Sequence, residues 1–181
     1  MDTPPERIEL PDLLLRRWTD DDAGALLLAV QESYDELHPW MPWAGQPPVL
    51  ADMEGFVRLT HEQWAGEEAF LYGIFDLAGG TVYGATGLHR RIGPGGLDIG
   101  YWLHTAHTGR GIATRTASVL TREAFALPGI DRVEIHTDVA NTASAAVPKR
   151  LGYRMDRIED HSIDAPAETG RRMIWVMPRT I

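Results

Sequence analysis

The most informative residues form the run Thr108-Gly109-Arg110-Gly111-Ile112-Ala113, which follows a strand-like segment and precedes a helix-like one. Glycines let the backbone turn tightly and expose successive N–H groups, and the start of a helix adds partial positive charge. The guanidinium of Arg110 can supply a formal charge as well. The run therefore predicts a loop that holds a phosphate or pyrophosphate, and we call it the phosphate loop.

Other glycine patterns do not compete with this loop. The chain contains no GxxxxGK[ST] motif, which excludes a Walker-type nucleotide site. The glycine cluster between Gly93 and Gly100 lies between two strand-like segments and does not open a helix. We interpret it as a hairpin turn.

Two polar residues mark a second strand-to-helix junction. Asn141 follows the end of a strand-like segment and precedes a helix-like one, so its amide can bind a ligand or cap the helix in an Asx turn. Ser144 lies in the first turn of that helix, where its hydroxyl can reach a ligand or bond to the backbone. The residues alone leave both alternatives open.

Composition excludes several kinds of chemistry. The formal net charge of −9 is opposite to that of a typical nucleic-acid binder, and it suits either a cationic substrate or simple solubility. The absence of cysteine excludes disulfides, thiolate nucleophiles and cysteine metal sites, so a reacting thiol must arrive with a cofactor. The histidines show no metal-binding spacing such as HExxH, and we predict no metal.

The chain length of 181 residues suits one domain, residues 1–181. No apolar run approaches the roughly 18 residues of a membrane span. The acidic, proline-rich start MDTPPERIELP lacks the basic and apolar regions of a secretory signal. We expect a cytoplasmic protein that does not bind membranes.

The expected elements are strands and helices in the order β-α-α-β-β-β-α-β-α-β-β. Between the first two helices, the six residues from His38 to Trp43 hold two prolines and two tryptophans, which predicts an ordered aromatic loop. The whole is an α/β (α+β) mixed sheet flanked by helices, with one β-α-β unit that makes its strands parallel. Strands are expected at 13–18, 69–76, 81–89, 97–103, 132–137, 153–164 and 169–178, and helices after Thr19, at 52–65, 111–126 and 143–151.

Four local matches, which span almost the whole chain, share the order and spacing of one family. They are Leu15-Arg16 with Asp22-Ala23 and LHPWMPW from Leu37 to Trp43; IGYWL from Ile99 to Leu103; GRGIAT from Gly109 to Thr114; and NTAS from Asn141 to Ser144 with KRLGY from Lys149 to Tyr153. The chain thus resembles the GNAT superfamily of N-acetyltransferases, in particular the branch that acetylates N-terminal amines of ribosomal proteins. The resemblance implies the GNAT fold, in which the strands at 97–103 and 132–137 are splayed.

The resemblance implies an acyl-CoA-dependent N-acyltransferase. It would transfer acetyl from acetyl-CoA to a primary amine, a protein N-terminus or a small molecule, by direct attack in a ternary complex. A non-catalytic acyl-CoA-binding or sensing module on the same fold is an alternative. A longer donor such as succinyl-CoA is another, and it would require a basic group near the acyl end. A homodimer is left open.

Cofactor-binding residues carry over from the family. The pantetheine arm would enter between the splayed strands and pair with the backbone like an added strand. Ser144 becomes a candidate general acid for the departing thiolate. One departure is Thr108, which stands where the family usually has Gln or Arg, so a side-chain contact is altered and affinity is expected to fall. The implied set is Trp102, Leu103, Thr108, Gly109, Arg110, Gly111, Ile112, Ala113, Thr114, Asn141, Ser144 and Lys149.

The reaction needs a proton acceptor, because a primary amine is largely protonated at neutral pH. Glu134 and His136 share one face of a strand by its period of two, and Glu134 is slightly preferred. Asp98, Asp156 and a chain of waters are alternatives. By analogy with the family, the acceptor would be walled by the aromatic loop, with His38, Trp40 and Trp43 as its residues, although core packing also explains a tryptophan.

Overall fold

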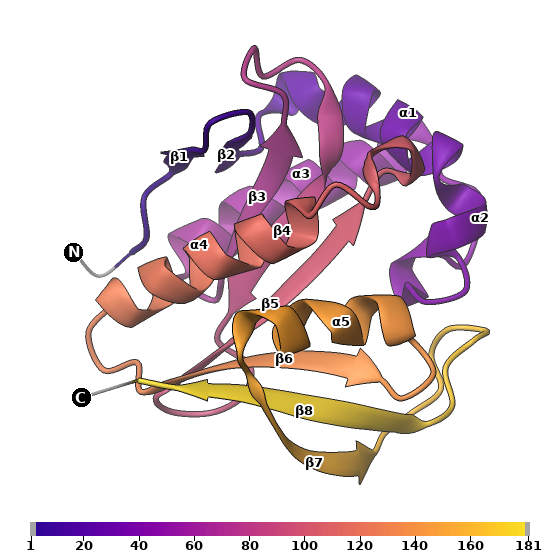
Figure 1. The fold of residues 1–181 in the computed structure, drawn as a ribbon. Helices are drawn as coiled ribbons and strands as arrows, with labels where there is room; N and C mark the ends of the chain where they lie inside the picture. The colour runs from indigo at the N-terminus through magenta and orange to yellow at the C-terminus, as the bar shows by residue number, and fades with distance from the viewer. Residues whose placement is uncertain (1–2, 180–181) are drawn as a thin grey trace.

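A computed structural model describes residues 3–179 and contains one sheet of eight strands in the order β1-β2-β3-β4-β5-β6-β8-β7 (Figure 1). The strands are β1 Arg7–Glu9, β2 Leu14–Arg17, β3 Ala69–Phe75, β4 Val82–His89, β5 Gly96–Leu103, β6 Arg132–Asp138, β7 Arg154–Asp160 and β8 Arg171–Pro178. The α-helices are α1 Ala23–Glu32, α2 Tyr34–Leu37, α3 Leu50–Ala65, α4 Ile112–Ala126 and α5 Thr142–Leu151. Short 3-10 helices are η1 Asp20–Asp22, η2 Pro42–Ala44 and η3 Thr105–His107.

The sheet is antiparallel except at one strand pair. Strands β5 and β6 are parallel and are joined through α4, as expected of the β-α-β unit. The last two strands pair as predicted, and β8 lies between β6 and β7. The predicted mixed sheet flanked by helices is confirmed. The three-residue strand β1 was not predicted, because a segment of this length carries almost no periodic signal. The residues of α2 lie within the helix predicted after Thr19, which the structure divides at Ser33.

Helices cover the two faces of the sheet unequally. Figure 1 shows α4 and α5 in front of the sheet and α3 behind it. On the α4 face, the buried side chains of Leu97, Ile99, Val133 and Ile135 form the larger apolar core with one side of α4. On the opposite face, which we call the α3 face, α1 and α3 form a second apolar core with β2, β3 and β4. Because strand side chains alternate, Asp98, Gly100 and Trp102 belong to the α3 face.

Within residues 3–179, no helix combines the length and the apolar character needed to cross a membrane.

Candidate functional site

The parallel strands β5 and β6 separate after a short paired stretch. Their register covers only three residue pairs, which end with Asp98 opposite Glu134. Beyond that point β5 continues to Leu103 alongside β4, and β6 continues to Asp138 alongside β8. The backbone of β5 from Ile99 onward is therefore left without a strand partner on its β6 side.

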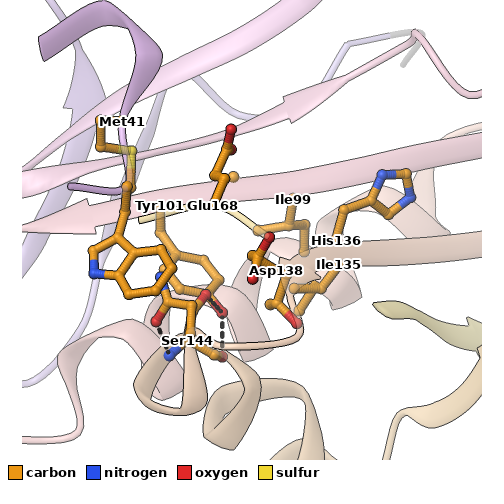
Figure 2. A pocket seen from close by; sticks show the side chains of 12 residues that line it. Met41, Ile99, Tyr101, Ile135, His136, Asp138, Ser144 and Glu168 are labelled. Carbon is orange, nitrogen blue, oxygen red and sulfur yellow. Dashed lines mark hydrogen bonds between the residues drawn. The ribbon is translucent and has the colours of Figure 1, made fainter. Parts of the chain in front are cut away.

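A cavity of about 200 Å³ lies across this separation, and we call it the gap cavity (Figure 2). Residues from both faces of the sheet line it, so it passes between the strands. The lining residues are Trp40, Met41, Ile99, Gly100, Tyr101, Ile135, His136, Thr137, Asp138, Asn141, Ser144 and Glu168.

Tyr101 and Ser144 form a hydrogen-bonded pair in the gap cavity (Figure 2). The Tyr101 hydroxyl donates to the Ser144 carbonyl oxygen at 2.9 Å, and Ser144 Oγ donates to the Tyr101 hydroxyl oxygen at 3.3 Å. Burial raises the pKa of Tyr101 to about 12, so the phenol keeps its proton at neutral pH. The sequence alone indicates no role for the Tyr101 side chain, because a tyrosine in a strand is usually a packing residue.

Asn141 lines the same cavity and caps helix α5. Its Oδ1 accepts a hydrogen bond from the Ser144 backbone N–H at 3.0 Å. The capping alternative is therefore present in the structure, and it positions Ser144 at the cavity wall. Its amide nitrogen faces no acceptor within residues 3–179, so binding of a ligand by Asn141 stays a prediction.

The phosphate loop is exposed from Thr108 to Gly111, and its last two residues, Ile112 and Ala113, begin α4. Gly109 and Gly111 have φ angles of 73° and 69°, a left-handed conformation that favours glycine. Within the described chain, the N–H groups of Gly109, Arg110 and Gly111 have no hydrogen-bond acceptor. The hydroxyl of Thr108 donates to the Thr105 carbonyl at 3.0 Å, so this side chain is used locally. The predicted geometry of backbone donors at a helix start is confirmed, and their ligand stays a prediction.

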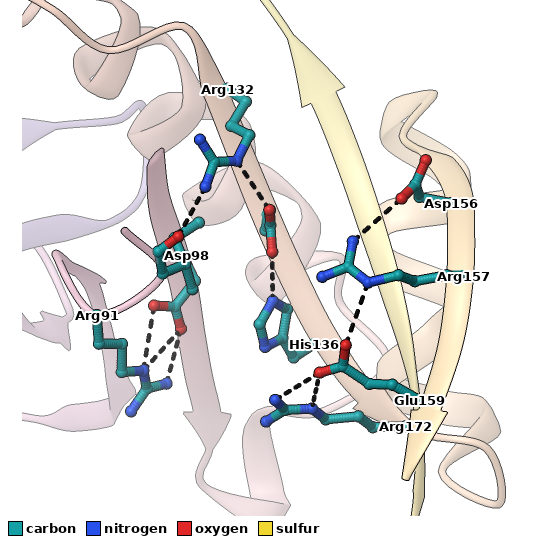
Figure 3. A network of polar contacts seen from close by, with 10 residues as sticks. Arg91, Asp98, Arg132, His136, Asp156, Arg157, Glu159 and Arg172 are labelled. Atoms are coloured by element: carbon teal, nitrogen blue, oxygen red, sulfur yellow. Dashed lines mark hydrogen bonds and ion pairs between the residues drawn. The ribbon is translucent and has the colours of Figure 1, made fainter. Parts of the chain in front are cut away.

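The acidic residues predicted as candidate bases are held by arginines (Figure 3), and none of them is among the residues that line the gap cavity. Asp98 accepts bonds of 2.7–3.1 Å from Arg91, and its side chain is 2% exposed. Glu134 accepts one bond from Arg132 at 3.0 Å and one from His136 Nε2 at 2.7 Å. Neither carboxylate lines the cavity.

His136 and Asp156, the other two candidates, also point elsewhere. His136 lines the gap cavity, but its ring is directed away from Tyr101 and Ser144 and towards Glu134 (Figures 2 and 3). Asp156 lies on the exposed strand β7 and pairs with Arg154 and Arg157. A base among the four predicted candidates stays a prediction.

Two carboxylates that the sequence analysis did not consider line the gap cavity, Asp138 at the end of β6 and Glu168 in the segment between β7 and β8. Asp138 accepts bonds from the N–H of Ala140 and from the N–H and hydroxyl of Thr169. Burial raises its pKa, but these bonds outweigh burial and lower the pKa below the usual value. Glu168 Oε2 accepts from the N–H groups of Asp164 and Ala165.

A larger cavity of about 530 Å³ lies on the α3 face, and we call it the α3 cavity. It shares Met41, Gly100 and Tyr101 with the gap cavity, so the two adjoin at these residues. Its lining is Leu26, Val30, Met41, Trp43, Asp52, Met53, Phe56, Leu59, Gln63, Leu71, Ala85, Thr86, Gly87, His89, Arg91, Gly100, Tyr101 and Trp102.

The predicted acceptor residues divide between the cavities. Trp40 lines the gap cavity and Trp43 the α3 cavity, whereas His38 lines neither. His38 Nδ1 instead bonds to the Ala44 carbonyl at 2.8 Å and so holds the aromatic loop. Among the predicted cofactor residues, Trp102 lines the α3 cavity, Leu103 packs on the α4-face core, and Lys149 is exposed in the last turn of α5.

Residues 12–154 match the model of the acetyltransferase (GNAT) domain, and the chain belongs to this family. It is thus an N-acetyltransferase, as the four local matches predicted. A similar curated protein is the "Putative ribosomal N-acetyltransferase YdaF" of Bacillus subtilis (strain 168), 28% identical over 144 residues, which are 78% of this chain and 77% of the relative.

Two solved structures illustrate the shared fold. The Microcin C7 self immunity acetyltransferase MccE, in complex with acetyl-CoA and AMP, superposes with a TM-score of 0.88 at 19% identity, over 98% of this chain and 99% of that one. RimL, the ribosomal L7/L12 alpha-N-protein acetyltransferase in complex with coenzyme A, gives a TM-score of 0.84 at 21% identity, over 96% and 98% of the two chains.

Proposed function

We propose that this protein transfers acetyl from acetyl-CoA to a primary amine, with both substrates bound together across the separation of β5 and β6. The observation that carries the proposal is the gap cavity, which passes between the parted strands and adjoins a second cavity on the opposite face. A donor can enter from the α4 face and an amine from the α3 face, so the two meet without a covalent enzyme intermediate.

The donor side combines three features of this chain. Unpaired backbone on β5 beyond Asp98 is available to an extended pantetheine arm, and the free N–H groups of the phosphate loop suit a diphosphate. Arg110, exposed beside these donors, adds positive charge. Solved relatives whose names mention acetyl-CoA or coenzyme A support this ligand. Acetyl-CoA supplies the thioester, which is the acyl group together with its leaving thiol.

We place the stabilisation of the departing sulfur at the Tyr101–Ser144 pair. The pKa of a thiol is about 8.5 and that of the Tyr101 phenol is about 12, so the departing thiolate is the weaker base. Complete proton transfer from Tyr101 to the thiolate is therefore unfavourable. A hydrogen bond from Ser144 Oγ or the Tyr101 hydroxyl still stabilises negative charge on sulfur. The predicted role of Ser144 is thereby refined from proton donor to hydrogen-bond donor.

We assign the removal of the amine proton to Glu168. Glu168 lines the gap cavity, and within the described chain its Oε1 accepts no hydrogen bond, while Oε2 is held by two backbone N–H groups. The ammonium form of the amine first loses one proton to solvent. As the N–C bond forms and the C–S bond breaks, the amine loses a second proton to Glu168, and this proton is passed on to the thiolate, so the base returns to its starting state. Glu134, the predicted base, is bound by Arg132 and His136 and serves less well.

The acceptor is an amine of a protein N-terminus or of a small molecule. The named activities of YdaF and RimL support a ribosomal protein as one candidate. A succinyl donor is disfavoured, because its second carboxylate would meet Asp138 and Glu168 in the gap cavity.

The test is release of free thiol from acetyl-CoA in the presence of a panel of amines and N-terminal peptides. The chain has no cysteine, so the enzyme contributes no background to a thiol-reactive dye. We expect Glu168→Gln to lower kcat by roughly 100-fold. A matched control is Asp160→Asn, whose side chain is 97% exposed on β7 and which should retain full activity.

Tight binding of acetyl-CoA without thiol release for any amine would overturn the proposal in favour of a binding module. Equal activity of Glu168→Gln and Asp160→Asn would reject Glu168 as the base and leave the overall reaction standing.

A further inference from the structure

The lining of the α3 cavity is dominated by large apolar side chains. Its walls include Phe56, Met41, Met53, Trp43 and Trp102. The Trp43 and Trp102 rings lie 5.8 Å apart at 54°, and Trp43 is 50% exposed although it is large and apolar. Aromatic rings and thioethers at such positions favour planar or bulky apolar ligands.

The floor of the α3 cavity is backbone, because Gly87 on β4 lies directly opposite Gly100 on β5. A Cβ on Gly87 would come within 2.4 Å of Leu71 Cδ2 and 3.1 Å of the Phe70 carbonyl oxygen, so packing explains this glycine. A Cβ on Gly100 would meet only the His89 ring, at 3.5 Å and 4.0 Å, which is ordinary contact. Packing does not demand glycine at position 100, where the two cavities adjoin.

Few charged groups border the α3 cavity. Arg91 is bound to the buried Asp98, and an Asp52 oxygen accepts a hydrogen bond from the Val49 backbone at 3.1 Å. Burial, with help from Arg91, lowers the pKa of His89 to about 4, so its imidazole is neutral at neutral pH. Within the described residues, Asp52 is therefore the one carboxylate of the lining without a cationic partner, which is a weak site for a polycationic acceptor.

Resting on the proposed function, we infer that the preferred acceptor is a primary amine that carries a planar aromatic group, with the ring in the α3 cavity and the amine at Gly100. The amine then reaches the gap cavity through the residues that the two cavities share, Met41, Gly100 and Tyr101. Burial of the aromatic ring in the cavity removes apolar surface from water and so favours binding. The bound ring also fixes the direction from which the amine nitrogen approaches the thioester.

The test compares kcat/KM within matched pairs of amines. One pair is 2-phenylethylamine and ethylamine; the other is two peptides that differ only in an N-terminal Phe or Ser. We expect a preference for the ring of roughly 10- to 100-fold in at least one pair. The pair in which it occurs identifies the source as a free amine or a protein N-terminus. Spermidine, which has charge but no ring, should be a poor acceptor.

Variants of the cavity should reduce this ratio. Trp43→Ala removes a wall and Gly100→Val fills the floor, so each should lower the preference for the ring roughly tenfold. Leu59→Ala, in the lining, has a matched control in Leu28→Ala, because both leucines are largely exposed on helices but Leu28 does not line the cavity. The control should keep the wild-type ratio.

Ringless amines or Ser peptides that react as well as their ring-bearing partners would overturn this inference and leave the proposed function intact. If no amine releases thiol, the proposed function fails, and calorimetry of 2-phenylethylamine against ethylamine on the protein with coenzyme A still decides the ligand. Equal affinities there, or no loss of affinity in Gly100→Val, would likewise contradict an aromatic acceptor.

Discussion

Two neighbouring rows of residues on the α3 face behave in opposite ways. The first row, His89, Asp98 and Glu134, crosses β4, β5 and β6 and consists of ionisable side chains; we call it the anchored row. The second row lies two residues further along each strand and begins with Gly87 and Gly100; we call it the open row. The strands β5 and β6 pair at the anchored row and have separated at the open row.

The comparison shows how one strand pair can be both fixed and parted. At the anchored row, Arg91 forms an ion pair with Asp98, and Arg132 forms one with Glu134 (Figure 3). Arg132 also donates to the carbonyls of Ile92 and Pro94 and so ties the β4–β5 turn to β6. At the open row, side chains are absent and the space becomes the junction of the two cavities. The ion pairs at the anchored row therefore hold β5 and β6 together, while the lack of side chains at the open row leaves space between them.

The largest effect is expected from breaking the anchored row at Arg132. Arg132→Ala would leave the Glu134 carboxylate, 5% exposed, without its guanidinium, and two carbonyls without a donor. We expect a loss of about 3 kcal/mol in the free energy of unfolding, measured by urea denaturation. Arg7→Ala, which breaks the exposed pair with Glu9, is the control and should cost under about 0.5 kcal/mol. Similar losses in both variants would show that the anchored row is no more than surface charge.

A second effect should appear as a pH dependence at His89. Burial and the nearby Arg91 lower its folded-state pKa to about 4, while Asp98 opposes them weakly. Between pH 6.5 and 4 the unfolded chain binds a proton that the folded chain does not, so this contribution to stability is complete above pH 6.5 and declines as the pH falls towards 4. We expect the wild type to lose about 2 kcal/mol from this group between pH 7 and 5.

The measurement is urea denaturation at both pH values for the wild type and His89→Gln. Glutamine cannot titrate, so the variant should lose correspondingly less stability over this interval. Parallel losses in the two proteins would mean that His89 takes up its proton in the folded state as readily as in the unfolded chain.

A third effect distinguishes the two glycines of the open row. Gly87→Ala forces a Cβ against Leu71 and the Phe70 carbonyl, and we expect a cost of about 1 to 2 kcal/mol. Gly100→Ala meets only ordinary contacts and should stay within about 0.5 kcal/mol of the wild type. Thermal unfolding of both variants decides the point. A large cost at Gly100 would mean that packing, and not a ligand, demands glycine there.

The smallest effect concerns the link that replaces strand pairing at the open row. Tyr101 joins β5 to α5 through Ser144, and Tyr101→Phe removes this hydrogen bond without changing the ring. We expect a loss of about 1 kcal/mol in stability and a roughly tenfold lower rate of thiol release. An unchanged turnover number in the Tyr101→Phe variant would assign the Tyr101 hydroxyl to structure alone.

Most of the fold follows from the sequence because its signals are local. The segments that form β3 to β6 alternate in polarity, which predicts strands, and the apolar residues of α4 fall on one side, which predicts a helix. Neither prediction requires knowledge of the element against which the segment packs. Strand β1 cannot be predicted in this way, because Arg7 and Glu9 are exposed and Ile8 is its one apolar residue. The phosphate loop and the α5 cap are equally local: the glycines predict the turn of the loop, and capping by Asn141 is one of the two roles that the sequence leaves open.

The chemistry at the gap cavity was harder to foresee, because its residues meet only through topology. Tyr101, Asp138 and Glu168 come from three separate segments, and the insertion of β8 between β6 and β7 helps to bring the last two together. One signal was available for Glu134: Arg132, Glu134 and His136 alternate on one strand face, which predicts that they satisfy one another. The same logic could not reveal His38, whose partner is a backbone carbonyl.

The lining of the α3 cavity comes entirely from residues 26–102, whereas the phosphate loop and the capped start of α5 lie later in the chain, between residues 108 and 144. Mutations that change the lining of the α3 cavity therefore need not alter the phosphate loop or the start of α5. Acceptor preference can therefore diverge within a lineage while the donor is kept, and position 100, one nucleotide change from alanine, offers the shortest route.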